Sequence, residues 1–141
     1  EKEATYRSIT IDFNYPEEPP TVVSDRAQLQ QVFLNIINNG IDAITHDKNE
    51  SYVGELIICT WQKNENTVAV KICDNGCGIP AENLKGIFDP FFSTKARGKG
   101  TGLGLSITYG IVEKLGGKVS VESEVNQGTA FTIELPRTSN L

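Results

Sequence analysis

The chain has 141 residues, of which 38% are hydrophobic and 22% are charged. Such a length and composition are typical of one globular domain, and they exclude an intrinsically disordered chain. The apolar runs are interrupted after a few residues, whereas a helix that crosses a membrane needs about 18. The formal net charge of −5 argues against a nucleic-acid partner, because nucleic-acid-binding surfaces are rich in Lys and Arg.

An odd number of cysteines and a single histidine limit the possible chemistry. Cys59, Cys73 and Cys77 form no secretory disulfide framework, which indicates a reducing, cytoplasmic compartment. A four-ligand zinc site would need His46 and a stretched arrangement of all three thiols, so we interpret the cysteines as structural and His46 as a surface residue. No G-x-S-x-G motif is present, which excludes a Ser-His-Asp hydrolase. Because the sequence lacks methionine, we expect residues 1–141 to be one domain of a longer protein.

The first elements of the chain are a strand and a long helix. Residues 7–15 alternate between apolar and polar, which predicts a half-buried strand with one apolar face formed by Ile9, Ile11, Phe13 and Tyr15. Ser24 or Asp25 is a suitable N-cap for a helix. Apolar residues then recur at i, i+3, i+4 and i+7, which predicts one amphipathic helix that continues to about Ile44.

The middle of the chain predicts a hairpin and a long irregular segment. A polar loop over residues 46–52 is followed by strands at 55–62 and 67–74. Residues 75–101 are rich in Gly and Pro and predict at most one short helix, near residues 80–86. Because so long an irregular segment is unusual in a compact domain, we interpret it as a functional loop.

The last third predicts a helix and a second hairpin. The helix covers residues 103–115 and ends at Gly116-Gly117, and the strands cover 118–123 and 129–135. The order β-α-β-β-loop-α-β-β predicts an α+β fold of two layers. In this fold, helices cover one face of a mixed, mostly antiparallel sheet.

The polar side of the first helix carries carboxamides. Gln28, Gln31, Asn35, Asn39 and Asp42 fall within a sector of roughly 80° when each residue turns about 100°. One interpretation is a solvated face. The other is that amide oxygens at i and i+4 bind Mg²⁺, which takes few ligands from protein and the rest from water and phosphate.

A second polar motif follows directly after an apolar strand. Asp74 can accept a hydrogen bond from an exocyclic amine, and Gly76 and Gly78 can let a flat ring lie against the backbone. Gly76, Gly78 and Ala81 also satisfy the G-x-G-x-x-G/A dinucleotide fingerprint. No second parallel strand follows within a βαβ unit, which excludes that interpretation.

A third motif, at residues 98–105, is rich in glycine and continues into the last predicted helix. Its free backbone N–H groups and the positive helix N-terminus predict a phosphate site. It is not a Walker loop, because Gly-Lys-Ser/Thr and an immediately preceding strand are both missing. Lys95, Arg97 and Lys99 lie just before it. They belong either to a solvated loop or, as we favour, to the counter-charge for phosphate.

Together these motifs resemble the catalytic, ATP-binding domain of sensor histidine kinases, a member of the Bergerat-fold GHKL superfamily. The resemblance spans nearly the whole chain and rests on four conserved boxes in the same order. They correspond to residues 34–43 (N box), 74–80 (G1 box), 87–95 (F box) and 100–107 (G2 box). Asp42-Ala43, after the second N-box asparagine, resembles the nitrogen-regulation type of these kinases.

The resemblance implies a site for ATP and Mg²⁺. Asn35 and Asn39 would hold the ion, Asp74 would accept from the adenine amine and Thr129 would support that carboxylate, while residues 87–101 would form an ATP lid. The implied catalytic residues are Asn35, Asn39 and Lys95. The full implied nucleotide site consists of Asn35, Asn39, Asp42, Ala43, Asp74, Gly76, Gly78, Ile79, Lys95, Lys99, Gly100, Thr101, Gly102, Leu103, Gly104, Leu105 and Thr129.

The implied reaction is transfer of the γ-phosphoryl group of ATP to a histidine on a separate, upstream dimerisation domain. A response regulator would then be an indirect partner, and this domain would contact neither nucleic acid nor membrane. ATP-hydrolysing and serine-kinase members of the superfamily place a carboxylate where this chain has Asn35, and an amide cannot act as a general base. An ATPase switch module or a serine kinase is therefore the alternative, and a nucleotide sensor without enzymatic activity is a third.

Overall fold

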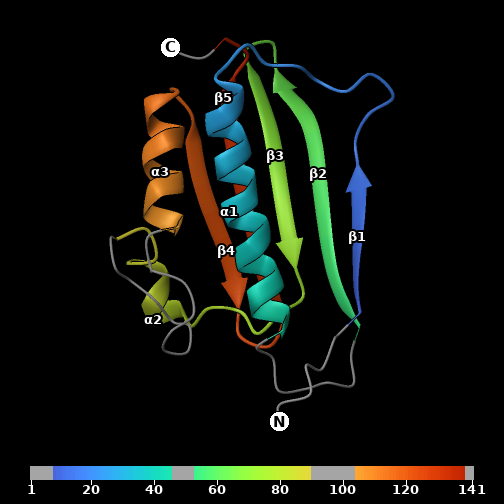
Figure 1. The fold of residues 1–141 in the computed structure, drawn as a ribbon, viewed down its shortest axis with the longest axis vertical. Coiled ribbons are helices and arrows are strands. Elements are labelled where there is room, and N and C mark those ends of the chain that lie inside the picture. The colour runs from blue at the N-terminus through green and yellow to red at the C-terminus, as the bar shows by residue number, and fades with distance from the viewer. Residues whose placement is uncertain (1–7, 46–52, 90–103, 139–141) are drawn as a thin grey trace.

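The computed structural model describes residues 8–45, 53–89 and 104–138 of the chain. Within these ranges the chain forms one sheet and three helices (Figure 1). The elements in chain order are β1 (Ile9–Asn14), α1 (Arg26–Thr45), β2 (Gly54–Asn64), β3 (Thr67–Asp74), α2 (Ala81–Leu84), α3 (Gly104–Lys114), β4 (Lys118–Glu124) and β5 (Gly128–Pro136).

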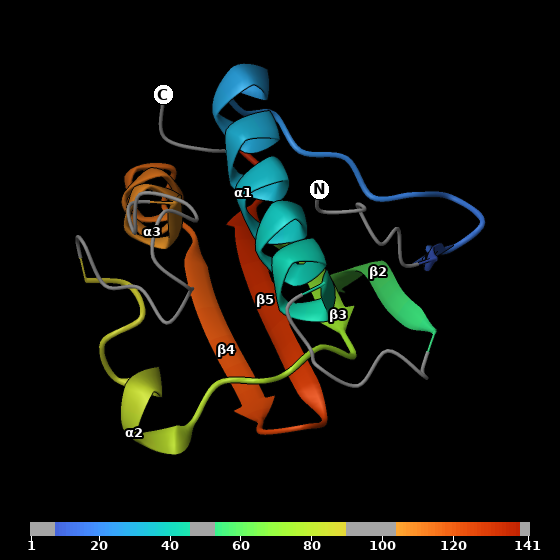
Figure 2. The ribbon, with the colours of Figure 1, turned by 60° about the horizontal axis from the view of Figure 1, so that its bottom comes forward.

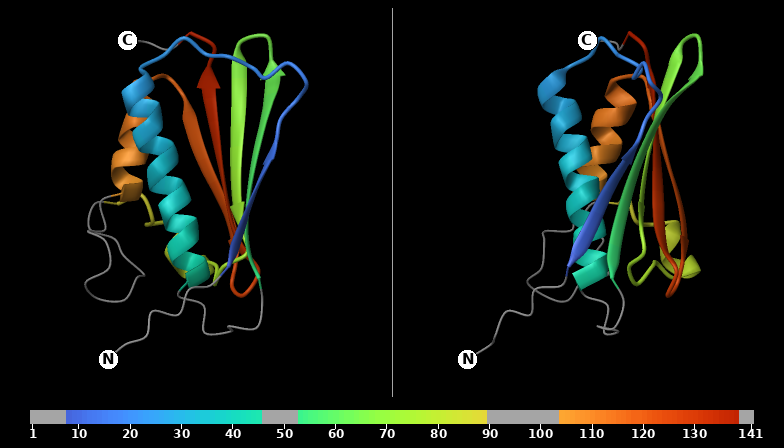
Figure 3. Two further views of the ribbon diagram at one scale, coloured as in Figure 1. Left: turned by 45° about the vertical axis from the view of Figure 1, so that its right-hand side comes forward. Right: turned by 90° about the vertical axis from the view of Figure 1, so that its right-hand side faces the viewer.

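The five strands lie in the order β1-β2-β3-β5-β4. Strand β1 pairs with β2 in parallel, and every other pair of neighbours is antiparallel. The long helices α1 and α3 lie side by side on one face of this sheet, as Figure 3 shows, whereas the short α2 lies beside the C-terminal end of β4 (Figure 2). The predicted α+β fold, with helices over a mixed and mostly antiparallel sheet, is confirmed.

The core lies between the two long helices and the sheet. Helix α1 buries its apolar stripe because its hydrophobic residues recur with the period of a helix. Alternate residues of β3 and β5 meet that stripe from the sheet. The fully buried large side chains of this core include Ile36, Ile44, Leu56, Phe131 and Ile133.

The predicted element boundaries agree with the structure to within a few residues. The Asp25 side chain accepts a hydrogen bond from the backbone N–H of Gln28 at 3.1 Å, which identifies Asp25 as the N-cap of α1. Helix α3 ends before Gly116, whose φ of 85° is the left-handed conformation expected of a glycine after a helix. The predicted polar loop 46–52 and the predicted irregular segment over 90–101 lie outside the described residues.

The prediction of a half-buried first strand is wrong. Ile11, Phe13 and Tyr15 are exposed, with 62% of the Phe13 surface accessible. The alternation did predict a strand, but β1 is the edge of the sheet and pairs only with β2. Only Ile9 at its start packs against the core, and no helix of the described residues covers Ile11 or Phe13. Periodicity reports which side chains share a face and not whether anything packs on that face.

None of the helices in the described ranges is long and apolar enough to cross a membrane.

Replacement of glycine by alanine should have opposite effects on stability at Gly128 and Gly110. Gly128 has a φ of 126°, and a Cβ there would lie 2.0 Å from the backbone oxygen of Asp74. Gly110 lies in α3, with nothing within 4 Å of an added Cβ. We expect Gly128→Ala to lower the free energy of unfolding by more than about 2 kcal/mol, because it adds strain and a backbone clash.

Gly110→Ala should instead raise the free energy of unfolding by roughly 0.5–1 kcal/mol, because alanine is the better helix former. Urea unfolding followed by circular dichroism measures both values. Equal effects of the two substitutions would contradict the close approach of Gly128 to β3.

Candidate functional site

Three separated parts of the chain meet at one end of the sheet. They are the second half of α1, the end of β3 with residues 75–79, and the hairpin between β4 and β5 (Figures 1 and 2). Gly40 of α1 approaches Asp74 so closely that an added Cβ would lie 3.4 Å from the carboxylate Oδ2 and 2.8 Å from Leu56. The fold therefore packs the buried face of α1 at Gly40 against the carboxylate predicted from the second motif, and Asn39 is the neighbouring residue on the helix.

Asp74 is a largely buried carboxylate. Its Oδ1 accepts a hydrogen bond from the backbone N–H of Gly76 at 2.9 Å, and the backbone N–H of Thr129 also donates to the carboxylate. Burial raises the pKa of Asp74 to about 6, although these two hydrogen bonds act in the opposite direction. The group is thus mainly ionised at neutral pH, but in surroundings that disfavour its charge. Such groups occur where function rather than stability selects the residue.

A hydroxyl network supports this corner. Ser123 Oγ accepts from the backbone N–H of Ile79 at 2.8 Å and donates to the backbone oxygen of Gly128 at 2.9 Å. The hydroxyl of Thr129 lies 2.7 Å from the same Ser123 oxygen. Because a serine hydroxyl offers one donor and two acceptor positions, Ser123 is fully used when Thr129 donates to it.

Sequence reasoning missed Ser123 and did not distinguish the backbone of Thr129 from its side chain. The resemblance implied that Thr129 supports Asp74. In the structure, the backbone N–H of Thr129 gives that support, while its buried side chain pairs with Ser123. The register of the β4–β5 hairpin, which places Ser123 opposite Thr129, is the signal that could have identified Ser123.

Gly76 and Gly78 are required by the packing of the protein itself. An added Cβ on Gly76 would lie 2.6 Å from the carbonyl carbon of Ala43, and one on Gly78 would lie 2.2 Å from the oxygen of Glu124. The backbone N–H of Cys77 also donates to the oxygen of Ala43 at 3.2 Å. Close contact between chain segments is therefore one reason for these glycines, and room for a flat ring stays a prediction.

Asn35 connects the two long helices. Its Nδ2 donates to the backbone oxygen of Gly104 and to Oγ1 of Thr108, both at 3.2 Å. Its Oδ1 accepts from Nε2 of Gln31 at 2.8 Å. Both ends of this amide are therefore engaged within the protein.

Amide oxygens are suitable ligands for Mg²⁺, which binds oxygen and keeps several non-protein ligands. Asn39 fits this role, because no hydrogen bond to another described residue holds its partly exposed amide. Asn35 fits it less well, because its two hydrogen bonds to α3 fix the amide and the bond from Gln31 takes one of the two acceptor positions of Oδ1. Asp42 is partly exposed one turn after Asn38 and makes contacts of its own.

The remaining predicted residues divide into two groups. Ile79 is partly buried beside Ser123, while Gly104 and Leu105 begin α3. Gly104 is exposed and has open space where a Cβ would lie. Six predicted residues lie outside the described ranges, so the structure does not place them. They are Lys95, Lys99, Gly100, Thr101, Gly102 and Leu103.

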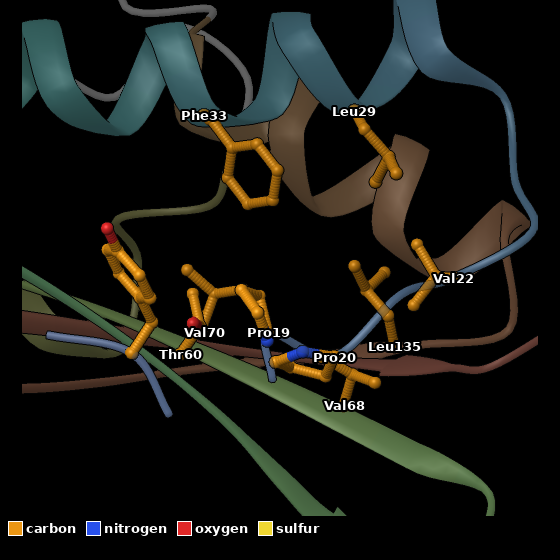
Figure 4. A pocket seen from close by; sticks show the side chains of 10 residues that line it. Pro19, Pro20, Val22, Leu29, Phe33, Thr60, Val68, Val70 and Leu135 are labelled. Atoms are coloured by element: carbon orange, nitrogen blue, oxygen red, sulfur yellow. The ribbon is translucent and has the colours of Figure 1, made fainter. Parts of the chain in front are cut away.

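A separate apolar cavity of about 460 Å³ lies between the first half of α1 and the sheet (Figure 4). Leu29 and Phe33 of α1 face Val68 and Val70 of β3 across it, and Pro19 and Pro20 form another wall. Val68 and Val70 precede Asp74 on β3, so the cavity lies toward the opposite end of the strand. Its walls offer no charged group for a phosphate, and we do not assign the nucleotide to it.

Residues 24–139 match the model of one protein family, described as histidine kinase-, DNA gyrase B- and HSP90-like ATPases. The chain belongs to this family. The matched residues include α1, β3, α3 and the β4–β5 hairpin. This match and the relatives described below confirm the prediction of a histidine kinase ATP-binding catalytic domain.

Two curated relatives and two solved structures illustrate the similarity. Sporulation kinase C of Bacillus subtilis is 37% identical over 97% of this chain, which covers 30% of that protein. The signal transduction histidine-protein kinase AtoS of Escherichia coli is 44% identical over 89% of this chain, which covers 20% of that protein. The chain thus spans less than a third of the length of these relatives.

Among solved structures, the nucleotide-free catalytic domain of histidine kinase ThkA has a TM-score of 0.76 and 35% identity, over 92% of this chain and 81% of that one. Full-length ShkA in complex with AMPPNP has a TM-score of 0.78 and 27% identity, over 94% of this chain and 26% of that one. The fold of the family is therefore shown by both sequence and structure.

The pKa of Asp74 predicts a pH-dependent stability. Below about pH 4 the Asp74 carboxyl is protonated in both the folded and the unfolded state, so it does not destabilise the fold. As pH rises through the folded-state pKa of about 6, the buried group becomes charged and the fold loses stability. We expect Asp74→Asn to be more stable than the wild type at pH 7 by up to about 2–3 kcal/mol, and the difference to vanish near pH 4.

Denaturant titrations between pH 4 and pH 8 measure this difference. Asp12→Asn removes an exposed carboxylate on β1 and is the matched control, which should follow the wild type at every pH. A constant difference between Asp74→Asn and the wild type over this range would contradict the raised pKa.

Ser123→Ala should destabilise the domain by about 1–3 kcal/mol, because it leaves the buried Thr129 hydroxyl and the Ile79 N–H without their partner. Ser120→Ala changes an exposed serine of the same strand and should stay within about 0.5 kcal/mol. Thermal unfolding of the two variants compares them, and equal midpoints would show that the network contributes no stability.

Proposed function

We propose that this domain binds ATP with Mg²⁺ at the end of the sheet where α1 meets Asp74, and that it donates the γ-phosphoryl group to a histidine of a separate domain. The observation that carries the proposal is the largely buried carboxylate of Asp74, which lies against Gly40 of α1, next to Asn39 in the helix. Membership of the ATPase family and the AMPPNP complex of the similar ShkA support it.

Asp74 is proposed to accept a hydrogen bond from the exocyclic amine of adenine. An ionised carboxylate has about four acceptor positions, and the N–H groups of Gly76 and Thr129 use two of them. Acceptor capacity therefore remains. Because the group only accepts, it would favour adenine over guanine, which presents a carbonyl oxygen at the corresponding position.

The phosphates would lie between α1 and the start of α3. Asn39 would hold Mg²⁺ through its amide oxygen, and the ion would supply positive charge that offsets the charge of the phosphates. The exposed N-terminus of α3 at Gly104 supplies the positive end of a helix dipole. Lys95, Lys99 and the glycines 100 and 102 are proposed to complete this phosphate site.

The position of Asn35 favours transfer to histidine over hydrolysis. A carboxylate there could take a proton from water or a hydroxyl, but an amide cannot, and this amide donates to α3. A neutral imidazole needs no such base because its nitrogen is already nucleophilic. That nitrogen would attack the γ-phosphorus, the bond to the β–γ bridging oxygen would break, and ADP would leave.

The acceptor histidine would come from another part of a longer protein. His46, the one histidine of this chain, lies outside the described residues. The curated relatives are three to five times longer than the portion matched here, since that portion covers 30% and 20% of them. We propose that the partner is a dimerisation domain with the acceptor histidine and that a response regulator receives the phosphoryl group afterwards.

The proposal predicts labelling only in the presence of a partner. With γ-labelled ATP and Mg²⁺, the chain alone should neither label itself nor hydrolyse ATP appreciably. Its cognate histidine domain, added in trans, should acquire label that is acid-labile and base-stable, as phosphohistidine is. Asp74→Asn should abolish this labelling through loss of adenine binding, and Asp12→Asn should not.

Two results would contradict the proposal. Substantial hydrolysis by the chain alone would favour an ATPase switch module. Label that survives acid, as phosphoserine does, would favour a serine kinase.

A further inference from the structure

The orientation of the Asn35 amide is determined by its neighbours. The backbone oxygen of Gly104 can only accept, so the Asn35 atom 3.2 Å from it must be the donating Nδ2. This assignment directs Oδ1 to the donating Nε2 of Gln31 at 2.8 Å. The reverse orientation would bring two oxygens together at Gly104, so hydrogen bonding alone selects one arrangement.

The acceptors of Asn35 are the first turn of α3. Gly104 and Thr108 are separated by four residues, one above the other on the same side of the helix. Thr108 is fully buried, and its hydroxyl accepts from Asn35 at 3.2 Å. One amide of α1 thus contacts both ends of the first turn of α3, where the two helices lie side by side (Figures 1 and 3).

We propose that Asn35 is a positioning residue that holds the first turn of α3 against α1, and not a ligand of Mg²⁺. This inference rests on the proposed function and changes the role that the resemblance implied for Asn35. Asn39 is then the asparagine of α1 that offers its oxygen to the ion.

The link matters because α3 begins at the proposed phosphate site. The free N–H groups of a helix N-terminus bind an anion only where their direction suits it, and they lie in the first turn. Gly104, the first residue of α3, is exposed, and apart from its own helix turn no atom of the described residues lies within 4 Å of the place where its Cβ would be. Asn35, oriented in turn by Gln31, therefore sets the direction of these groups before the nucleotide binds.

Asparagine-to-aspartate substitutions separate the two roles. Asp is a better ligand for Mg²⁺ than Asn, but it has no N–H to donate to Gly104. If Asn35 positions α3, Asn35→Asp should weaken binding of Mg-ADP at least about tenfold, because two donated hydrogen bonds are lost. Asn38→Asp adds the same charge to the exposed side of α1 and should retain binding within about threefold. Isothermal titration calorimetry measures both.

Thr108 provides an independent test that leaves the asparagine unchanged. Thr108→Val removes the hydroxyl that accepts from Asn35 and should weaken Mg-ADP binding about two- to fivefold. Thr108→Ser keeps the hydroxyl and should restore it. In the nucleotide-free protein, amide hydrogen exchange in the first turn of α3 should be faster in Asn35→Asp and Thr108→Val, but not in Asn39→Asp or in Asn38→Ala, an exposed α1 control.

The outcomes distinguish the inference from the function on which it rests. If the wild type binds Mg-ADP and Asn35→Asp binds it equally well, the hydrogen bonds that Asn35 donates to α3 do not position the site and the inference is wrong. Unchanged exchange in α3 for Asn35→Asp and Thr108→Val would also overturn it. If the wild type binds no adenine nucleotide at all, the proposed function itself fails.

Discussion

The close approach of α1 to the end of β3 is the constraint on which the site depends. At Gly40 the helix lies so near the strand that a methyl group would contact Leu56 and reach the Asp74 carboxylate. A similar contact joins Ala43 of α1 to Gly76 after the strand. Because the absence of side chains permits both contacts, the carboxamides of α1 and the carboxylate of β3 come to one end of the sheet. A bulkier residue at either position would separate the two parts of the proposed site.

Asp74 illustrates a conflict between stability and function. Its charge is partly removed from water, and burial outweighs the two backbone hydrogen bonds that favour ionisation. The surrounding hairpin compensates with a saturated network, in which Ser123 joins residues 79, 128 and 129. Under the proposed function, an acceptor that cannot donate suits the exocyclic amine of adenine, so a group that disfavours folding at neutral pH would still be appropriate at this position.

The hydrogen bonds of Asn35 give a physical reason for an amide at this position. A glutamate, which would suit hydrolysis, could not donate to the Gly104 carbonyl and would direct its charge toward that oxygen. The residue proposed to favour phosphoryl transfer over hydrolysis thus also connects α1 with α3. Two asparagines one turn apart, which a pattern treats as equivalent, differ because one of them lies against α3 and the other is free of described partners.

The sequence by itself determined the elements, their order and the family, since periodicity, capping residues and motif spacing are local properties of the chain. It also predicted Asp74, Asn35 and Asn39 as residues of the candidate site. Only the tertiary structure decided which faces are covered, and it left Phe13 exposed because β1 lies beyond the reach of α1. It likewise placed Gly76 against α1 and joined Ser123 to the Thr129 hydroxyl. The Asn35 amide is directed toward α3 for the same reason. These properties depend on partners distant in the chain, up to 73 residues away for Thr108, and no local pattern contains them.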